Sequence, residues 1–155
     1  MAVLVIGVDP GDSTGVAAIR NTELITAWQG PANDAVTAVE ILLGHYRYDA
    51  ITVACERYVQ RRAGRATEQP TAQRVSGAVE RLAADHNAYF HLQGASEAWA
   101  AASNEFLRKV GMWTPARDVG RPDADDANMA TRHALLGLMT YHAQLFEMIL
   151  LEAGA

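Results

Sequence analysis

The fold is decided by the stretch VLVIGVDPGDSTGVAAIR, residues 3–20. Residues 3–9 form a nearly continuous apolar run before a Pro-Gly turn, which predicts a buried strand ending at Asp9. Residues 15–20 and 23–28 predict two further short strands, joined by a two-residue turn. Three strands with two short connections predict an antiparallel meander.

Strand and helix patterns alternate along the rest of the chain. A helix is expected with Asn33 as its cap. Residues 50–55 follow it as a strand that is apolar on both faces, which predicts a central strand parallel to the first. The remaining expected elements are a helix after Pro70, a strand over 88–92, one helix over 96–110 with Trp99 on its inner face, an irregular segment over 112–122, and a helix opened by Asp123. The predicted fold class is α/β, a mixed five-stranded sheet flanked by helices.

The length of 155 residues suits one domain over 1–155, with 141–155 as a C-terminal helical extension that covers the core or extends a dimer contact. Cys55 is the one cysteine, so no intrachain disulfide framework is expected and a reducing cytoplasm fits. The N-terminal apolar run lacks the basic leader of a secretory signal. The apolar stretch 134–151 is interrupted by polar residues, so no membrane span is expected.

Charge is distributed unevenly over the chain. The net charge is −5, but residues 57–81 hold six arginines against two glutamates, so this segment carries +4 and the other 130 residues carry −9. Arginine forks onto phosphate oxygens, which favours a nucleic-acid contact. A solvated surface accounts for the same residues, so composition alone leaves both interpretations open.

Four carboxylates stand at predicted strand ends or at a helix start: Asp9, Glu56, Asp123 and Asp126. If the first and fourth strands are neighbours, Asp9 and Glu56 emerge at one edge of the sheet. Taken singly, Asp9 also suits a turn, Asp123 a helix cap and Asp126 the first turn of a helix. Such a structural role fits Glu56 less well, because it ends a buried strand. Two carboxylates about 4 Å apart repel by about 4 kcal/mol at a dielectric of 20. A cluster therefore needs a cation or raised pKa values, and an oxygen-only ligand set points to Mg²⁺ or Mn²⁺.

Three segments carry a family resemblance: IGVDPGDSTGVA (6–17), ACERYV (54–59) and DADDANMATRHALLGL (123–138). In this order they resemble the RuvC Holliday-junction resolvases of the RNase H-like nuclease superfamily, and the short chain looks most like the compact phage members. The resemblance implies an RNase H-like fold and a homodimer that cuts two strands of a four-way DNA junction, leaving 5′-phosphate and 3′-hydroxyl ends. For a phage-encoded protein the expected location is the host cytoplasm.

The resemblance also implies that Asp9, Glu56, Asp123 and Asp126 are the catalytic residues and metal ligands, with Asp125 beside them as a non-ligand. Two Mg²⁺ or Mn²⁺ ions about 3.5–4 Å apart are expected. Asp9 would bridge both ions, Glu56 and Asp126 would bind one each, and Asp123 would complete the site or position the water.

DNA contacts are expected mainly in the arginine-rich segment that begins after Glu56. At the position where cellular members of the family usually have a phenylalanine, three residues after the glutamate, this chain has Val59, with Tyr58 beside it. The expected DNA-binding residues are Arg57, Tyr58, Arg61, Arg62, Arg65, Arg74, Arg108 and Lys109. The helix after Pro70 is either the dimer interface or ordinary core.

Three other functions share some of these features. An ATPase of the actin and sugar-kinase superfold has a DPGDSTG-type loop, but 155 residues leave no room for its two lobes. A nuclease for flaps or forks, or a non-catalytic DNA-binding module of the same fold, stays open. His133 lies two turns beyond Asp126 and is either a buried structural residue or a neighbour of the site.

Overall fold

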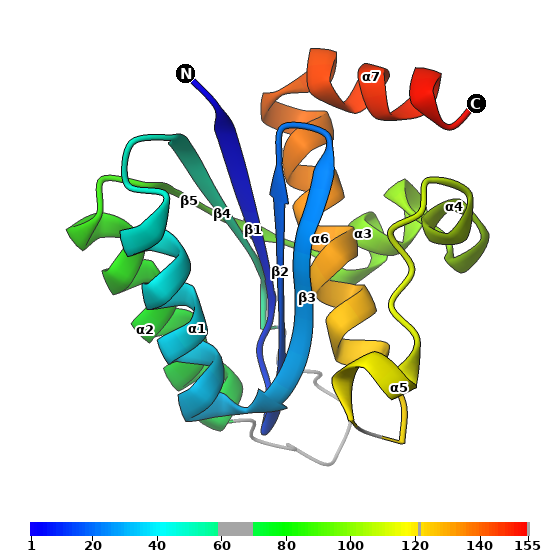
Figure 1. The fold of residues 1–155 in the computed structure, drawn as a ribbon. Helices are drawn as coiled ribbons and strands as arrows, with labels where there is room; N and C mark the ends of the chain where they lie inside the picture. The colour runs from blue at the N-terminus through cyan, green and yellow to red at the C-terminus, as the bar shows by residue number, and fades with distance from the viewer. Residues whose placement is uncertain (59–69, 121, 155) are drawn as a thin grey trace.

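The computed structural model describes residues 1–58, 70–120 and 122–154. It contains a five-stranded sheet in the order β3-β2-β1-β4-β5 (Figure 1). The strands are β1 (Val3–Asp9), β2 (Ser13–Arg20), β3 (Glu23–Pro31), β4 (Ala50–Glu56) and β5 (Tyr89–Gln93). Strands β1 to β3 pair antiparallel, while β4 pairs parallel to both β1 and β5. The predicted meander and the predicted parallel central strand are confirmed.

Helices cover both faces of this sheet. They are α1 (Ala32–His45), α2 (Pro70–Asp85), α3 (Ala95–Ala101), α4 (Asn104–Lys109), α5 (Ala116–Val119), α6 (Asp125–Tyr141) and α7 (Ala143–Glu152). Figure 1 shows α1 and α2 on one side of the sheet and α6 on the other, with α3 and α4 beyond it. The buried apolar residues accordingly form two clusters, one on each face.

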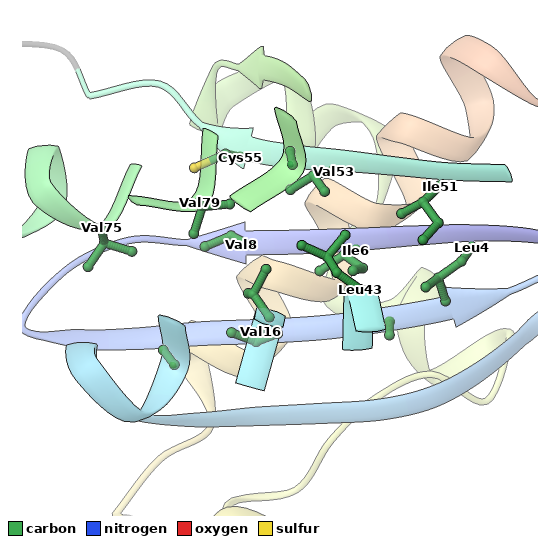
Figure 2. Packing of buried hydrophobic residues seen from close by; sticks show 14 residues of the cluster. Leu4, Ile6, Val8, Val16, Leu43, Ile51, Val53, Cys55, Val75 and Val79 are labelled. Atoms are coloured by element: carbon green, nitrogen blue, oxygen red, sulfur yellow. The ribbon is translucent and has the colours of Figure 1, made fainter. Parts of the chain in front are cut away.

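The first cluster settles the role of the apolar stripe on α2. Val75 and Val79 are buried there, together with Leu43 of α1, against Ile6 and Val8 of β1 (Figure 2). These valines would be exposed in a single chain if they formed a dimer interface. They belong to the core instead.

Helix α6 packs on the other face so closely that no side chain fits between its backbone and Gly7 of β1. A Cβ on Gly7 of β1 would stand 1.9 Å from the Ala130 carbonyl oxygen and 2.7 Å from the Ala134 nitrogen. Only a glycine fits in this position, and the facing residues of α6 are themselves alanines. Small residues on both elements therefore let α6 lie directly on β1.

Several element boundaries differ from the predictions. Strand β3 continues to Pro31 and α1 begins at once, so Asn33 lies inside the helix and does not cap it. The irregular segment contains the short helix α5. Helix α6 begins at Asp125, two residues after the predicted start at Asp123.

The single helix expected over 96–110 is divided into α3 and α4 at Ala102 and Ser103. Ala102 is extended, and its carbonyl accepts a hydrogen bond from Nε of the buried Arg132 at 2.8 Å. The Ser103 side chain caps α4 by accepting from the Phe106 N–H at 3.1 Å. Trp99, expected on the inner face, is 49% exposed and lies under the Arg132 guanidinium, whose central carbon is 3.8 Å from the ring centre.

The C-terminal segment covers the second cluster. Helices α6 and α7 meet at a bend of 119°, and Ile149 is buried while Leu145 and Phe146 pack against the core. Within the described residues, no single helix is both long and apolar enough to cross a membrane. In the part of the chain that the structure describes, only the bent pair α6 and α7 passes that test of length and composition, and most of α6 from Ala127 to Leu138 is buried inside the protein.

Candidate active site

Two carboxylates come from the ends of neighbouring parallel strands. Val8 of β1 is in register with Cys55 of β4, and the next residue on each strand is an acid, Asp9 and Glu56. Parallel pairing brings these strand ends to one edge of the sheet. The sequence-based expectation that both acids emerge together is met.

A third carboxylate, Asp126, joins them from the first turn of α6. Gly15 pairs with Asp9 across the β1–β2 ladder. A Cβ on Gly15 would stand 1.9 Å from the Asp126 carbonyl oxygen, so the helix start rests on the glycine backbone. The absence of a side chain at Gly15 therefore lets the backbone of Asp126 lie against the residue that pairs with Asp9.

The beginning of α6 is held by Gln29, a residue that the sequence pattern did not single out. Gln29 is 4% exposed; its Nε2 donates to the Asp123 carbonyl at 2.9 Å, and its Oε1 accepts from the Ala127 N–H at 3.0 Å. The cap residue Ala124 has no side-chain bond to offer. A lone glutamine in the apolar β3 segment was the available signal, and nothing in the sequence connects it to a helix almost 100 residues later.

The Pro-Gly turn after Asp9 is closed by Thr14. Its hydroxyl donates to the Gly11 carbonyl at 2.8 Å and accepts from the Gly11 N–H at 3.2 Å. Thr14 is fully buried, so this turn is anchored to the sheet. It forms one rim of the pocket that contains the carboxylates.

The pocket has a volume of about 680 Å³. Its described lining is Asp9, Pro10, Gly11, Asp12, Ser13, Glu56, Pro70, Thr71, Ala72 and Asp126. Three predicted site acids thus share one pocket, facing the first turn of α2. The N-terminal end of a helix carries partial positive charge, which suits an anionic group bound between the acids and α2.

Electrostatic repulsion is concentrated on Asp9. Burial raises the pKa of its carboxyl from 3.8 to about 9, and the charges of Glu56 and Asp126, followed by their hydrogen bonds to Asp9, act in the same direction. Without a cation the three acids are compatible only if Asp9 keeps its proton. A bound cation would remove that requirement.

The donor set of this pocket fits Mg²⁺ or Mn²⁺, because it consists of carboxylate oxygens without a cysteine or a paired histidine. Among the described residues, no three His, Cys, Asp or Glu side chains are already arranged to hold an ion. The one proton of the Asp9 carboxyl instead lies between this group and the neighbouring carboxylates of Glu56 and Asp126. An ion would take the place of that proton.

The fourth predicted acid, Asp123, lies apart from the other three. It is exposed, it is absent from the described lining of the pocket, and its Oδ1 accepts from the Asp125 N–H at 3.2 Å. Its side chain therefore forms a local contact with the first residue of α6, the helix that carries Asp126. Asp125 is also exposed and is absent from the described lining of the pocket.

The predicted DNA-binding residues are only partly described. Arg57 is exposed directly after Glu56, and its N–H donates to the Gln93 carbonyl at 2.7 Å. Arg74 is exposed on α2, in a groove that shares Thr71 with the carboxylate pocket. Tyr58 is partly buried. Arg61, Arg62 and Arg65 lie outside the described residues.

Arg108 and Lys109 are exposed at the end of α4. No residue of α4 appears in the described lining of the carboxylate pocket. The Arg108 guanidinium lies over the Trp113 ring, with 4.2 Å between its central carbon and the ring centre. These two cations belong to a different part of the surface from Arg57 and Arg74.

The sheet order and the position of α6 define the class of fold as RNase H-like, of the RuvC type. Two solved structures share it: Thermus thermophilus RuvC in complex with a Holliday junction substrate, with a TM-score of 0.60, and Thermus thermophilus RuvC, with a TM-score of 0.53. Each is 19% identical to this chain and aligns over 92% of it and 96% of its own length. No protein-family model and no curated protein sequence matches this chain.

Proposed function

We propose that this protein is a metal-dependent endonuclease that resolves four-way DNA junctions by hydrolysing phosphodiesters in two strands. One observation carries the proposal: Asp9, Glu56 and Asp126 share one pocket at the sheet edge of a RuvC-type fold. A solved structure with this fold is described as a complex with a Holliday junction substrate. The raised pKa of Asp9 supports a cation at this position.

In this proposal Asp9, Glu56 and Asp126 would hold two divalent ions, and Asp9 interacts with both of the other acids. When bound, such ions supply an activated water and neutralise charge on the departing 3′-oxygen. Asp123 acts from outside the pocket, by fixing the helix start and so the position of Asp126. The products carry 5′-phosphate and 3′-hydroxyl ends.

The DNA backbone is proposed to enter between the acids and α2. Thr71 and the first turn of α2 line the pocket, and Arg74 lies one turn along the same helix. Arg57 adds a second exposed cation directly after Glu56 in the chain. Positive charge next to the acids would hold a phosphate against the repulsion of three carboxylates.

Paired cleavage requires two such sites, so a homodimer is part of the proposal. The buried stripe of α2 is not available for it, because Val75 and Val79 are in the core. Sedimentation of the protein with and without a junction measures the oligomeric state. A dimer is the expected result, and a monomer in both conditions would contradict paired cutting.

The substrate is tested with labelled four-way junction, flap, fork and linear duplex DNA, each with Mg²⁺ or with EDTA. Symmetric nicks in the four-way junction that need Mg²⁺ are expected. Preferential cutting of flaps or forks would replace this substrate with another branched DNA. Junction binding without any cleavage would identify a non-catalytic DNA-binding module.

A matched pair of variants links the cleavage to the pocket. Asp126→Asn removes one charge inside the pocket, and Asp125→Asn removes the same charge from the exposed neighbouring position. Loss of cleavage only in Asp126→Asn is the expected result. Equal activity of the two variants would place the chemistry elsewhere.

A further inference from the structure

A buried histidine lies directly behind one of the proposed metal-binding acids. His133 of α6 is 0% exposed, and its Nε2 is 3.1 Å from Oε2 of Glu56. The Glu56 side chain is 26% exposed, so it connects the closed interior to the pocket. The other ring nitrogen, Nδ1, is 2.9 Å from the side-chain amide of Gln93.

The surroundings of Gln93 assign the proton on His133. Only one orientation of the Gln93 amide pairs each donor with an acceptor. In this orientation the amide nitrogen donates to the His133 carbonyl at 3.1 Å and to His133 Nδ1 at 2.9 Å. In that orientation its oxygen accepts from the Gly137 N–H at 3.2 Å. Nδ1 therefore accepts, the single ring proton is on Nε2, and Nε2–H donates to Glu56.

The fold brings these groups together by close packing. Gln93 is the last residue of β5 and is in register with Glu56 on β4. On the facing helix, a Cβ at Gly137 would stand 2.9 Å from Val5 Cγ1 and 3.8 Å from the Gln93 amide. The glycine lets α6 approach closely enough for the amide to reach its backbone.

This polar chain lies next to the apolar cluster on the same face of the sheet. Ala54, Ala134 and Leu138 are all fully buried in the cluster on this face of the sheet. Buried polar groups are costly unless each has its partners, and an apolar set of similar volume packs without that demand. Here each polar group of Gln93 and His133 has a hydrogen-bond partner, and the series of hydrogen bonds ends at Glu56. Its geometry favours a role at the site over a role in stability alone.

We propose that His133 is a positioning residue: as a neutral Nε2–H donor held by Gln93, it fixes the Glu56 carboxylate for metal binding. The proposal rests on the function proposed above and adds a part that the four acids do not supply. One oxygen of Glu56 is occupied by the histidine, which leaves the other for an ion. His133 is not itself a ligand, because both of its ring nitrogens already have partners inside the protein. Outer partners of this kind typically contribute 10–100-fold to metal affinity.

Three substitutions separate the positioning role from packing. His133→Gln places an amide N–H near the position of Nε2 and keeps the donor to Glu56. His133→Asn reaches only the position of Nδ1, so it loses that donor while remaining polar. His133→Leu removes both. Urea unfolding of each variant compares stability, and the glutamine and asparagine pair carries the test if the leucine variant does not fold.

The readout is the dissociation constant for Mn²⁺, measured by titration calorimetry on the 155-residue chain without DNA. We expect about 10–100-fold weaker Mn²⁺ binding for His133→Asn, and binding within a few-fold of wild type for His133→Gln. The same order is expected for cleavage at low Mg²⁺, with recovery at high Mg²⁺.

Two results would overturn the proposal: wild-type Mn²⁺ affinity in His133→Asn, or equal losses in the glutamine and asparagine variants. A failure of the proposed nuclease function would give a different result from these two. A wild-type protein that binds no Mn²⁺ and cuts no junction would refute the nuclease itself. A wild type that does both, beside an unaffected His133→Asn variant, would refute only the positioning role.

Discussion

Gly15 lies against the backbone of Asp126, so closely that a Cβ at position 15 would stand 1.9 Å from the Asp126 carbonyl oxygen. Gly15 is also the partner of Asp9 in the β1–β2 ladder. One position without a side chain thus brings an acid of the sheet and an acid of the helix to the same pocket.

Replacing Gly15 with alanine should damage both the site and the fold. The new methyl group would overlap backbone atoms, so the first turn of α6 would have to move. We expect a loss of stability of about 1–3 kcal/mol and a fall in cleavage of about 100-fold, since small displacements of catalytic groups are that costly. Gly44→Ala is the control, because a Cβ there meets nothing within 4 Å. Wild-type stability and cleavage in Gly15→Ala would contradict the proposed close approach.

Removing the amide of Gln29 should loosen the beginning of α6. In Gln29→Leu the Ala127 N–H and the Asp123 carbonyl lose their partner, and unsatisfied buried groups cost about 1–3 kcal/mol each. We expect lower stability in urea unfolding and weaker Mn²⁺ binding, since Asp126 stands in that turn. Gln144→Leu, on the exposed face of α7, should change neither property. Equal behaviour of the two variants would show that Gln29 does not hold the helix start.

The metal-free protein should lose stability as the pH rises. Folded Asp9 keeps its proton up to about pH 9, whereas the ordinary value is 3.8. The folded state therefore binds more protons between these values, and Asp9 lowers the free energy of unfolding by at most about 1.4 kcal/mol per pH unit. In EDTA at pH 8, Asp9→Asn should be more stable than wild type by about 1 kcal/mol or more. Mg²⁺ should stabilise wild type and not Asp9→Asn.

Urea unfolding of both proteins from pH 5 to pH 9, with EDTA or Mg²⁺, checks this prediction. Asp125→Asn serves as the control for removing a charge near the site, because Asp125 is exposed. The same pH slope in wild type and Asp9→Asn would show that the three acids do not interact as described.

The arginine-rich segment gives a prediction that rests on the sequence. If Arg61, Arg62 and Arg65 bind phosphates, replacing all three with alanine should lower the slope of log affinity against log salt by about 0.9 for each phosphate that is no longer neutralised. Affinity should fall equally for all junction sequences, because phosphate contacts do not read bases. Arg81→Ala is the control within the same basic segment, since Arg81 pairs with Asp85 at 3.0 Å. An unchanged slope in the triple variant would show that these arginines are solvated surface residues that do not bind phosphates.

The sheet was predictable because its signals are local. The apolar run of β1, the two short connections and the double-sided apolar content of β4 predict which strands are neighbours, and together they give the observed order of β3, β2, β1 and β4. The position of β5 beside β4 did not follow from these signals. The division between α3 and α4 was not predictable in this way. It depends on Arg132, which lies 30 residues later in the chain and donates a hydrogen bond to the Ala102 carbonyl.

The candidate site shows the same limit. Asp9 and Glu56 follow from strand ends, and Asp126 from the predicted helix start, so local pattern and resemblance located them. Asp123 was grouped with them as the predicted first residue of the helix, but α6 begins two residues later, and the Asp123 side chain is exposed and accepts from the Asp125 N–H. Gln29 and Gln93 act through contacts between distant segments, which no local pattern encodes.

The most direct test of the central claim is cleavage of a labelled four-way junction in Mg²⁺ by wild type and by Glu56→Gln, with junction binding measured in EDTA. Glu56→Gln keeps the shape of the side chain and removes the charge that an ion requires. We predict symmetric nicks with wild type, no cleavage with the variant, and junction affinity retained or increased in the variant. Cleavage by Glu56→Gln near the wild-type rate, or no Mg²⁺-dependent cleavage by wild type, would contradict the proposed metal-dependent nuclease.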